Sequence, residues 1–323
     1  MTAAASLSTI RAPFPWFGGK RRVAADVWAA FGDVANYVEP FAGSLAVLLG
    51  RPTLPRIETV NDADAYLANF WRAVKAAPNE VEHWCSWPVN EADLHARHLW
   101  LIGRSEFRER MLADPDFYDV KIAGWWVWGL CSWIGSGWCD LGNAGRGVHR
   151  PSQQLPHLGN AMGVHRPSQQ LPHLGDAGMG ASVPLFDELS ERLRRVRVAC
   201  GDWSRVLGDS VTWRHGVTGV FLDPPYDDGE VSYAAGGTGI SAAVREWATE
   251  AGAHPKMRVA LCGYDGEHDM PDTWSVHAWK AHGGYGSQRS DGVNENAKRE
   301  RIWFSPHCLS ASAAQISLFP GAA

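Results

Sequence analysis

VANYVEPFAGSLAVLL, residues 34–49, is the stretch of sequence that decides the fold. A short apolar run leads into a turn that contains Pro40 and Gly43, and a second apolar run follows. This order predicts a strand, a tight turn and a helix. Residues 57–75, IETVNDADAYLANFWRAVK, repeat the plan, because a strand ending in Asn-Asp precedes apolar residues at helical spacing. Two successive strand–helix units indicate an α/β fold.

A strand followed by an acidic residue recurs in VRVACGD, residues 196–202, and in GVFLD, residues 219–223. Further strands are predicted at residues 258–263 and 301–305. Strands that alternate with helices imply a Rossmann-like, doubly wound and mostly parallel sheet, whose ligands bind beyond the carboxyl ends of the strands. We therefore expect one crevice to be lined by the acidic residues at four strand ends: Glu39, Asp62, Asp202 and Asp223.

The middle of the chain departs from this alternation. Residues 78–138 are predicted to be helical and rich in aromatic residues, and a tandem duplication of GVHRPSQQLPHLG follows. We expect a long loop here, which either reaches DNA through its His, Arg and Gln side chains or takes no part in binding. The predicted organisation is an α/β domain in two segments (11–76 and 194–306), an inserted, mostly helical module (77–193) with the duplicated loop (147–178), and a flexible tail (307–323).

Five tryptophans lie near the end of the helical part of the middle segment. They could stack on nucleic-acid bases, but this part is apolar on nearly every side, which favours packing in a helical core. These residues are Trp125, Trp126, Trp128, Trp133 and Trp138.

Composition narrows the class of protein. The 323 residues contain no apolar run of the roughly 18 residues that a membrane helix needs, and no secretory signal is recognisable. The six cysteines form no CxxC pair and no metal-ligand spacing, so we expect buried thiols, no metal site and a cytoplasmic protein. The formal net charge of −5 means that nucleic acid would have to be attracted by a local basic patch.

The motif that carries chemistry is Asp223-Pro224-Pro225-Tyr226, directly after the apolar run GVFL. An aromatic amine is a poor nucleophile because its nitrogen lone pair is delocalised into the ring. The Asp223 carboxylate and the Pro224 carbonyl can accept hydrogen bonds from both amine hydrogens and so free the lone pair, while Pro225 keeps the backbone rigid. Tyr226 offers a flat face on which an extruded base can stack. A proline-rich turn after a buried strand is the alternative interpretation.

Other strand ends carry the features of a nucleoside-binding site. The turn from Phe41 to Gly43 lets the backbone approach a ligand, and the helix after it begins with unpaired amides. Asp62 is placed to accept hydrogen bonds from ribose hydroxyls. Asp202 and Trp203 could bind an adenine amine and stack on its ring. Together with Glu39 at the end of the first strand, these residues are the predicted contacts of the cofactor.

In this order, the motifs resemble those of the DNA adenine N6-methyltransferases typified by the bacterial Dam enzymes, the D12 class, whose members also occur in phages. The matching segments are PWFGGK (15–20), YVEPFAGS (37–44), VNDADAYLANFW (60–71), GDW (201–203), DPPY (223–226) and, loosely, RERIWFS (299–305). The resemblance covers both predicted segments of the catalytic domain and leaves the middle of the chain unmatched.

The resemblance implies S-adenosylmethionine as cofactor and adenine in double-stranded DNA as substrate, in the cytoplasm of a bacterial host. It also implies that Trp16, Lys20, Asp62 and Asp223 contact the cofactor, and that the inserted module recognises DNA. Lys20 and the two arginines after it have a second interpretation, as a phosphate-facing patch or the solvated start of a helix. Alternative functions are cytosine N4 methylation, RNA methylation, a bulkier modification of adenine, or noncatalytic DNA binding on a methyltransferase fold.

The tail contains Gln315-Ile316-Ser317-Leu318-Phe319, which is similar to the pentapeptide through which bacterial replication proteins bind the DNA sliding clamp. A short extended peptide can dock such apolar anchors in a groove of a partner. Alternatively, Leu318 and Phe319 fold back onto the domain.

Deleting residues 314–323 tests the clamp hypothesis. The deletion is expected to abolish co-elution with a purified bacterial sliding clamp in size-exclusion chromatography, because both apolar anchors are lost, and to leave methylation of DNA intact. Co-elution that persists after the deletion contradicts the hypothesis.

Overall fold

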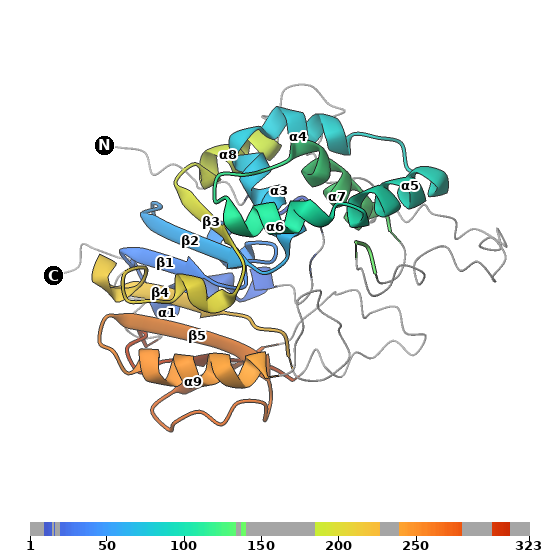
Figure 1. Ribbon diagram of the computed structural model, residues 1–323. Helices are drawn as coiled ribbons and strands as arrows, with labels where there is room; N and C mark the ends of the chain where they lie inside the picture. Colours follow the sequence, from blue (N-terminus) through green and yellow to red (C-terminus); the bar gives the residue numbers. More distant parts are fainter. Residues whose placement is uncertain are drawn as a thin grey trace, which may run out of the picture. The chain divides into compact units, whose positions relative to one another are not determined.

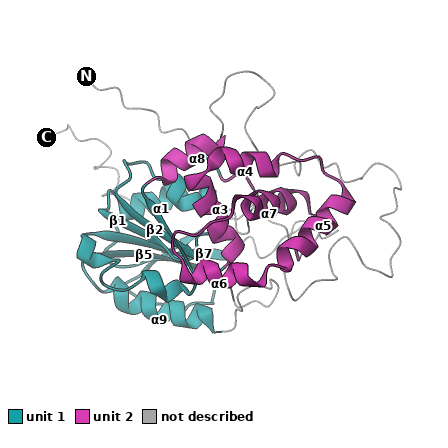
Figure 2. Ribbon diagram, turned by 45° about the horizontal axis from the view of Figure 1, so that its top comes forward, with its two compact units in different colours: residues 1–11, 16–63, 195–323 teal, residues 12–15, 64–194 magenta. Residues whose placement is uncertain are grey.

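The structure, a computed structural model (Figure 1), describes most of the chain and divides it into two compact units. The described residues are 10–14, 16, 20–133, 137–139, 185–226, 239–279 and 299–310. Unit 1 comprises residues 1–11, 16–63 and 195–323, and unit 2 comprises residues 12–15 and 64–194 (Figure 2). Among the described residues, no helix is long and apolar enough to cross a membrane.

Unit 1 contains a seven-stranded sheet. Its strands are β1 (Asn36–Glu39), β2 (Ile57–Asp62), β3 (Val196–Cys200), β4 (Thr218–Leu222), β5 (Met257–Tyr264), β6 (Ser275–Ala278) and β7 (Glu300–Phe304). Their order is β3-β2-β1-β4-β5-β7-β6, with β1 to β5 parallel and β7 antiparallel to both of its neighbours. The predicted mixed α/β sheet is therefore confirmed, and its arrangement is consistent with a methyltransferase fold.

Helices cover both faces of this sheet. The helical segments of unit 1 are η1 (Lys20–Arg22), α1 (Ala24–Phe31), α2 (Ala46–Leu49), η3 (Trp203–Val206), η4 (Trp213–His215) and α9 (Ile240–Gly252). In β1, Tyr37 packs against Phe31 of α1, whereas Val38 belongs to the same apolar cluster as Val244 and Ala248 of α9. Because consecutive side chains of a strand point to opposite faces, α1 and α9 lie on opposite sides of the sheet (Figure 1).

The register brings the predicted acidic residues to one edge of the sheet. The strands β3, β2, β1 and β4 are neighbours and run parallel, so their carboxyl ends lie side by side. Val60 pairs with Glu39, and Val220 pairs with Val38. Extending this register by two or three residues places Asp62 and Asp223 level with each other, on the two sides of the chain that leaves β1.

Unit 2 is helical and has an aromatic core. Its helices are α3 (Ala65–Ala76), α4 (Pro78–Cys85), α5 (Glu91–Ile102), α6 (Ser105–Ala113), α7 (Val120–Ser132) and α8 (Leu185–Leu193). Phe14 packs edge-on against Phe70 of α3 and Trp126 of α7. Among the five tryptophans, Trp126, Trp128 and Trp133 are buried, which confirms core packing for these three.

Some expectations change once the fold is known. Helix α3, which the predicted boundary at residue 76 places in the catalytic domain, groups with unit 2. β6 was not predicted, because all four of its side chains are exposed and the strand has no apolar alternation. The predicted burial of the thiols holds for every cysteine except Cys308, which is partly exposed. The duplicated loop and the clamp-like peptide lie outside the described residues.

Gly124 of α7 tests the packing of unit 2. A Cβ atom at this position would lie 2.3 Å from Cβ of Trp84 and 2.8 Å from its main-chain carbon, so α4 would have to move away. Gly124→Ala is expected to lower the free energy of unfolding by about 1–3 kcal/mol, although Ala normally favours a helix. Urea denaturation measures the change. Gly208→Ala is the control, since no atom lies within 4 Å of its added methyl group; a Gly124→Ala variant as stable as this control contradicts the packing.

Candidate active site at the carboxyl edge of the sheet

The turn between β1 and α2 has the tight geometry that the sequence predicts. Gly43 has φ +47°, and a Cβ atom added to it would lie 2.6 Å from Nε1 of Trp16. Leu45 is fully buried and also left-handed, with φ 55°. Such a conformation costs a non-glycine residue about 1–3 kcal/mol, and strain of this kind is often stored at functional sites. Gly43 therefore lets the Trp16 side chain approach the backbone closely, in a turn whose conformation its surroundings hold in place.

Asn61 and Asp62 fix the strand ends around this turn. The buried Asn61 amide donates to the carbonyl of Pro40 at 3.1 Å and to the carbonyl of Gly201 at 2.9 Å, so it joins the ends of β1, β2 and β3. The Oδ2 atom of Asp62 accepts a hydrogen bond from the Gly43 amide at 3.1 Å. The predicted ribose-binding carboxylate is therefore also the residue that orients the glycine turn.

Glu39 departs from the expected arrangement. Rather than lining an open crevice, its side chain is buried, with only 3% of the residue exposed. The carboxyl accepts a hydrogen bond from the Tyr37 hydroxyl at 2.9 Å and one from the main chain of Leu48 in the first turn of α2. Burial raises the pKa of Glu39 to about 8, although these hydrogen bonds oppose the rise. Glu39 thus holds the start of α2 from inside the fold.

Asp202 and Trp203 lie at the end of β3. One oxygen of the exposed Asp202 carboxylate accepts from the amide of Ser204 at 2.9 Å and from its hydroxyl, and so caps η3. The rings of Trp203 and Phe41 are nearly parallel, with centroids 6.2 Å apart and an interplanar angle of 23°. Aromatic side chains that follow the ends of β1 and β3 therefore stack on each other beside the glycine turn.

Lys20 forms the centre of a buried polar cluster. Its ammonium lies 3.1 Å from Oδ1 of Asp223, 2.7 Å from the hydroxyl oxygen of Tyr226 and 3.1 Å from Oε2 of Glu300. An ammonium has three N–H donors, and each of these acceptors can take one. The Tyr226 hydroxyl also lies 3.0 Å from both Asp223 Oδ1 and Glu300 Oε2. The four side chains come from η1, the end of β4 and the start of β7.

Burial sets the charges in this cluster. Burial opposes the charged form of Lys20, but the carboxylates of Asp223 and Glu300 outweigh it and raise the pKa of the ammonium. Burial, together with nearby acidic groups led by Asp223, raises the pKa of Tyr226, so its hydroxyl keeps its proton. Burial also raises the pKa of Glu300, with Lys20 opposing the rise. The cluster thus holds a cation that stays charged and a phenol that stays a donor.

These contacts correct one interpretation of Lys20. The residue is only 6% exposed, so it is neither part of a phosphate-facing patch nor the solvated start of a helix, although Arg21 and Arg22 beside it are exposed. Glu300 was not predicted as a site residue. It stands between two arginines, a charged setting typical of a surface strand, and only the loose match of residues 299–305 pointed to it.

The remaining residues of the DPPY motif occupy the same edge. Pro224 is buried, and Pro225 and Tyr226 are partly exposed. The Tyr226 ring packs edge-on against Tyr264 at the end of β5, with centroids 4.6 Å apart. Its hydroxyl is therefore fixed by the polar cluster and its ring by a neighbouring aromatic side chain. Stacking of this ring on a base stays a prediction.

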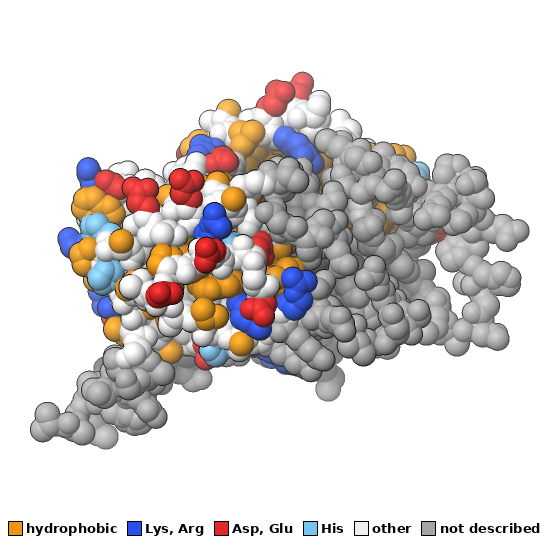
Figure 3. Space-filling model, turned by 90° about the horizontal axis from the view of Figure 1, so that it is seen from below, with side chains coloured by type: hydrophobic (Ala, Val, Ile, Leu, Met, Phe, Trp, Pro, Cys, Tyr) orange, Lys and Arg blue, Asp and Glu red, His pale blue; other side chains and the backbone are white. Residues whose placement is uncertain are grey.

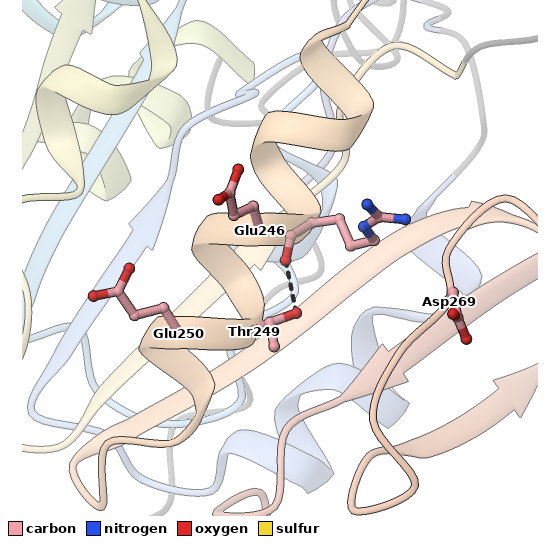
Figure 4. Close-up of a pocket in the computed structure, with 5 residues that line it drawn as sticks. Glu246, Thr249, Glu250 and Asp269 are labelled. Atoms are coloured by element: carbon pink, nitrogen blue, oxygen red, sulfur yellow. Dashed lines mark hydrogen bonds between the residues drawn. The ribbon is translucent and has the colours of Figure 1, made fainter.

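A surface depression elsewhere on unit 1 is a weaker candidate for a ligand site (Figure 4). It is lined by Arg245, Glu246, Thr249 and Glu250 of α9 and by Asp269. Figure 4 shows the hydrogen bond from the Thr249 hydroxyl to the Arg245 carbonyl, 2.9 Å long, which is internal to the helix. The three carboxylates would repel a nucleic-acid phosphate, and none of the predicted site residues lies here.

Glu39→Gln tests the buried carboxyl. Because the pKa is raised in the folded state, the stabilising contribution of Glu39 is fully present below about pH 4.5 and is lost as the pH rises through about 8. Glutamine mimics the protonated acid at every pH. Between pH 5 and pH 8 the variant is therefore expected to lose less unfolding free energy than the wild type, by on the order of a few kcal/mol. Urea denaturation at both pH values measures this difference, and equal losses contradict the buried placement.

Comparison with known proteins agrees with the motifs. No curated protein matches the chain. Residues 16–109 match the model of a protein family described as D12 class N6 adenine-specific DNA methyltransferase. This segment contains Trp16, Lys20 and the glycine turn and ends within α6, whereas Asp223 and Glu300 lie outside it. Over residues 16–109, the resemblance of the chain to the D12 class N6 adenine-specific DNA methyltransferases is therefore confirmed.

Proposed function

We propose that the chain transfers a methyl group from S-adenosylmethionine to the N6 amine of adenine in DNA. The observation that carries this proposal is the position of Asp223, a carboxylate at the end of a buried strand. Its Oδ1 atom is held by Lys20 and by Tyr226, while the side chain is still 22% exposed. The family match of residues 16–109 supports DNA adenine methylation as the activity.

The residues around the glycine turn fit the cofactor. The lack of a side chain at Gly43 lets Trp16 lie against the turn, and the Asp62 carboxylate accepts a hydrogen bond from the Gly43 amide. In our proposal a purine stacks on an outer face of the nearly parallel rings of Phe41 and Trp203. Asp62 and Asp223 are separated by one strand, or about 10 Å across the sheet. A ligand lying across the end of β1 would thus have its ribose at Asp62 and its reactive end toward Asp223.

Glu39 and Lys20 take indirect roles in this proposal. Glu39 supports the cofactor site by holding the first turn of α2 from below, rather than by touching the ligand. Lys20 orients Asp223, since the described contacts use its three N–H donors on Asp223, Tyr226 and Glu300. Asp202, which caps η3 with one carboxylate oxygen, keeps its predicted contact with an adenine amine as a hypothesis.

The chemistry at the amine follows from the geometry of Asp223. S-adenosylmethionine supplies an electrophilic methyl group on a positively charged sulfur. Among the described residues, the contacts of Asp223 fall on Oδ1, which leaves Oδ2 to accept a hydrogen bond from the adenine amine. In our proposal the Pro224 carbonyl accepts a hydrogen bond from the second N–H of the amine, so the nitrogen lone pair turns toward the methyl group. As the new C–N bond forms, the bond between the methyl group and sulfur breaks, and S-adenosylhomocysteine is the leaving group. The methylated amine gives up one proton to water, and no covalent enzyme intermediate is needed.

Recognition of DNA is assigned to the second unit in this proposal. We propose that the helices of unit 2, within the predicted module at residues 77–193, take part in binding the duplex. On the face of the molecule in Figure 3, Lys and Arg side chains alternate with Asp and Glu across the described surface. With a net charge of −5, attraction to phosphate has to come from local basic side chains.

Asp223→Ala tests the proposed chemistry. The variant is expected to lose at least about 10²-fold in kcat, because the amine loses an acceptor that is aligned in the transition state. Its fold should persist, since Glu300 still pairs with Lys20. Transfer of radiolabelled methyl groups to DNA measures the activity, and circular dichroism measures the fold.

Glu246→Ala is the matched control for this experiment. Glu246 is an exposed carboxylate on α9, away from the predicted site residues, so its removal should leave the rate unchanged. Methylation by Asp223→Ala at the rate of this control contradicts the mechanism.

A further inference from the structure

We infer that Glu300 is a positioning residue of the proposed methyltransferase, which holds Lys20 and Tyr226 so that Asp223 presents its second oxygen to the amine. This inference rests on the proposed function. Neither the sequence motifs nor the family match, which ends at residue 109, assigns a role to Glu300. Three features of the buried cluster assign this role to Glu300: the anchoring of its backbone, the hydrogen bonds that it accepts and the charge that it carries.

The backbone of Glu300 is anchored on two sides. Glu300 opens β7, where it pairs with Tyr264 at the end of β5. Its carbonyl accepts a hydrogen bond from the amide of Trp279, just beyond β6, at 3.3 Å. The side chain has only 6% of its surface exposed. Because β7 runs antiparallel to β5, its first residue lies at the edge where the parallel strands end. Glu300 therefore reaches the DPPY motif from a rigid position on the sheet.

Counting protons shows what Glu300 controls. The Tyr226 hydroxyl accepts one hydrogen bond from Lys20 and can donate one hydrogen bond of its own. Asp223 Oδ1 and Glu300 Oε2 both lie 3.0 Å from that hydroxyl, so the two carboxylates compete for this hydrogen bond. Lys20 is shared between them as well, at 3.1 Å from each. Glu300 thus limits how strongly Lys20 and Tyr226 bind Asp223.

Charge gives the same role to Glu300. Lys20 carries one positive charge, whereas Asp223 and Glu300 together carry two negative charges when ionised. Glu300 therefore leaves Asp223 with negative charge that Lys20 does not fully neutralise. A carboxylate in this state is a stronger acceptor for an amine hydrogen. Without Glu300, both donors would turn to Asp223, and its acceptor strength and its orientation would change together.

The expected effect lies in kcat. A shift of about 1 Å in a reacting group can lower a rate by on the order of 10²-fold. Glu300→Ala is expected to lower kcat by about that factor. Glu300→Gln keeps the shape of the side chain and one acceptor oxygen but loses the charge. Its kcat is expected to fall by roughly 10-fold. The KM for S-adenosylmethionine should change by less than about twofold, because Glu300 is not among the residues around the glycine turn.

The experiment combines these variants of the full chain with Tyr226→Phe. Rates of methyl transfer to DNA give kcat and KM, calorimetry gives the affinity for S-adenosylmethionine, and thermal unfolding reports the fold. If Glu300→Ala fails to fold, Glu300→Gln still tests the inference, because glutamine has the same shape as glutamate. Asp265→Asn is the matched control: this exposed carboxylate pairs with Arg301 at 3.0 Å beside the same strand end, and its loss should leave kcat unchanged.

Each outcome decides between a positioning role and its alternatives. A fall in kcat at constant KM, with Glu300→Gln and Tyr226→Phe less than additive in the double variant, supports the inference. An unchanged kcat, additive effects of the two changes, or a fall in kcat matched by a lowered Tm and a raised KM overturns it. A wild-type protein that binds S-adenosylmethionine but methylates no nucleic acid overturns the proposed function and this inference with it.

Discussion

The buried ammonium of Lys20 is the interaction on which the site depends. It lies within 3.1 Å of acceptors from the end of β4 and the start of β7 and so connects three distant parts of the chain. A buried cation is stable only when it is paired, and removing one partner of a buried ion pair typically costs about 3–5 kcal/mol. Here two carboxylates and a phenol share it, so the ammonium stays paired while the side chain of Asp223 is 22% exposed.

The part of this edge that the ends of β1, β2 and β3 form is held together by hydrogen bonds to the main chain. Asn61 joins the ends of three strands, Asp62 orients the Gly43 amide, and the buried Glu39 carboxyl supports the first turn of α2. These contacts keep Leu45 in a left-handed conformation that an isolated peptide would avoid. The sheet thus has two neighbouring environments at this edge, a strained turn and a charged cluster, separated by about 10 Å.

The sequence predicts the parts of this arrangement that have a periodic or local signal. Buried strands such as β1, β2 and β4 are apolar runs followed by an acid, and parallel pairing brings their ends together for geometric reasons. The exposed strand β6 has no such signal. The left-handed Gly43 follows from a turn motif, whereas the side to which Glu39 points depends on α2 packing beneath it.

The partners of Lys20 show why the rest of the site could not be predicted. Glu300 is 280 residues from Lys20 in the sequence, and only the antiparallel placement of β7 brings the two together. In the sequence, Lys20 begins a run of three basic residues and Glu300 stands between arginines, so each has the pattern of a solvated residue. Burial of a charge depends on the charges around it in space, and those come from long-range contacts.

The family match ends before the proposed catalytic motif, so the proposed activity depends on chemistry at Asp223. Mass spectrometry of deoxynucleosides, from DNA incubated with the protein and S-adenosylmethionine, tests that claim most directly. The account predicts N6-methyldeoxyadenosine as the modified nucleoside, formed only when the cofactor is present. N4-methyldeoxycytidine in its place, or no modified nucleoside from a protein that binds the cofactor, would contradict it.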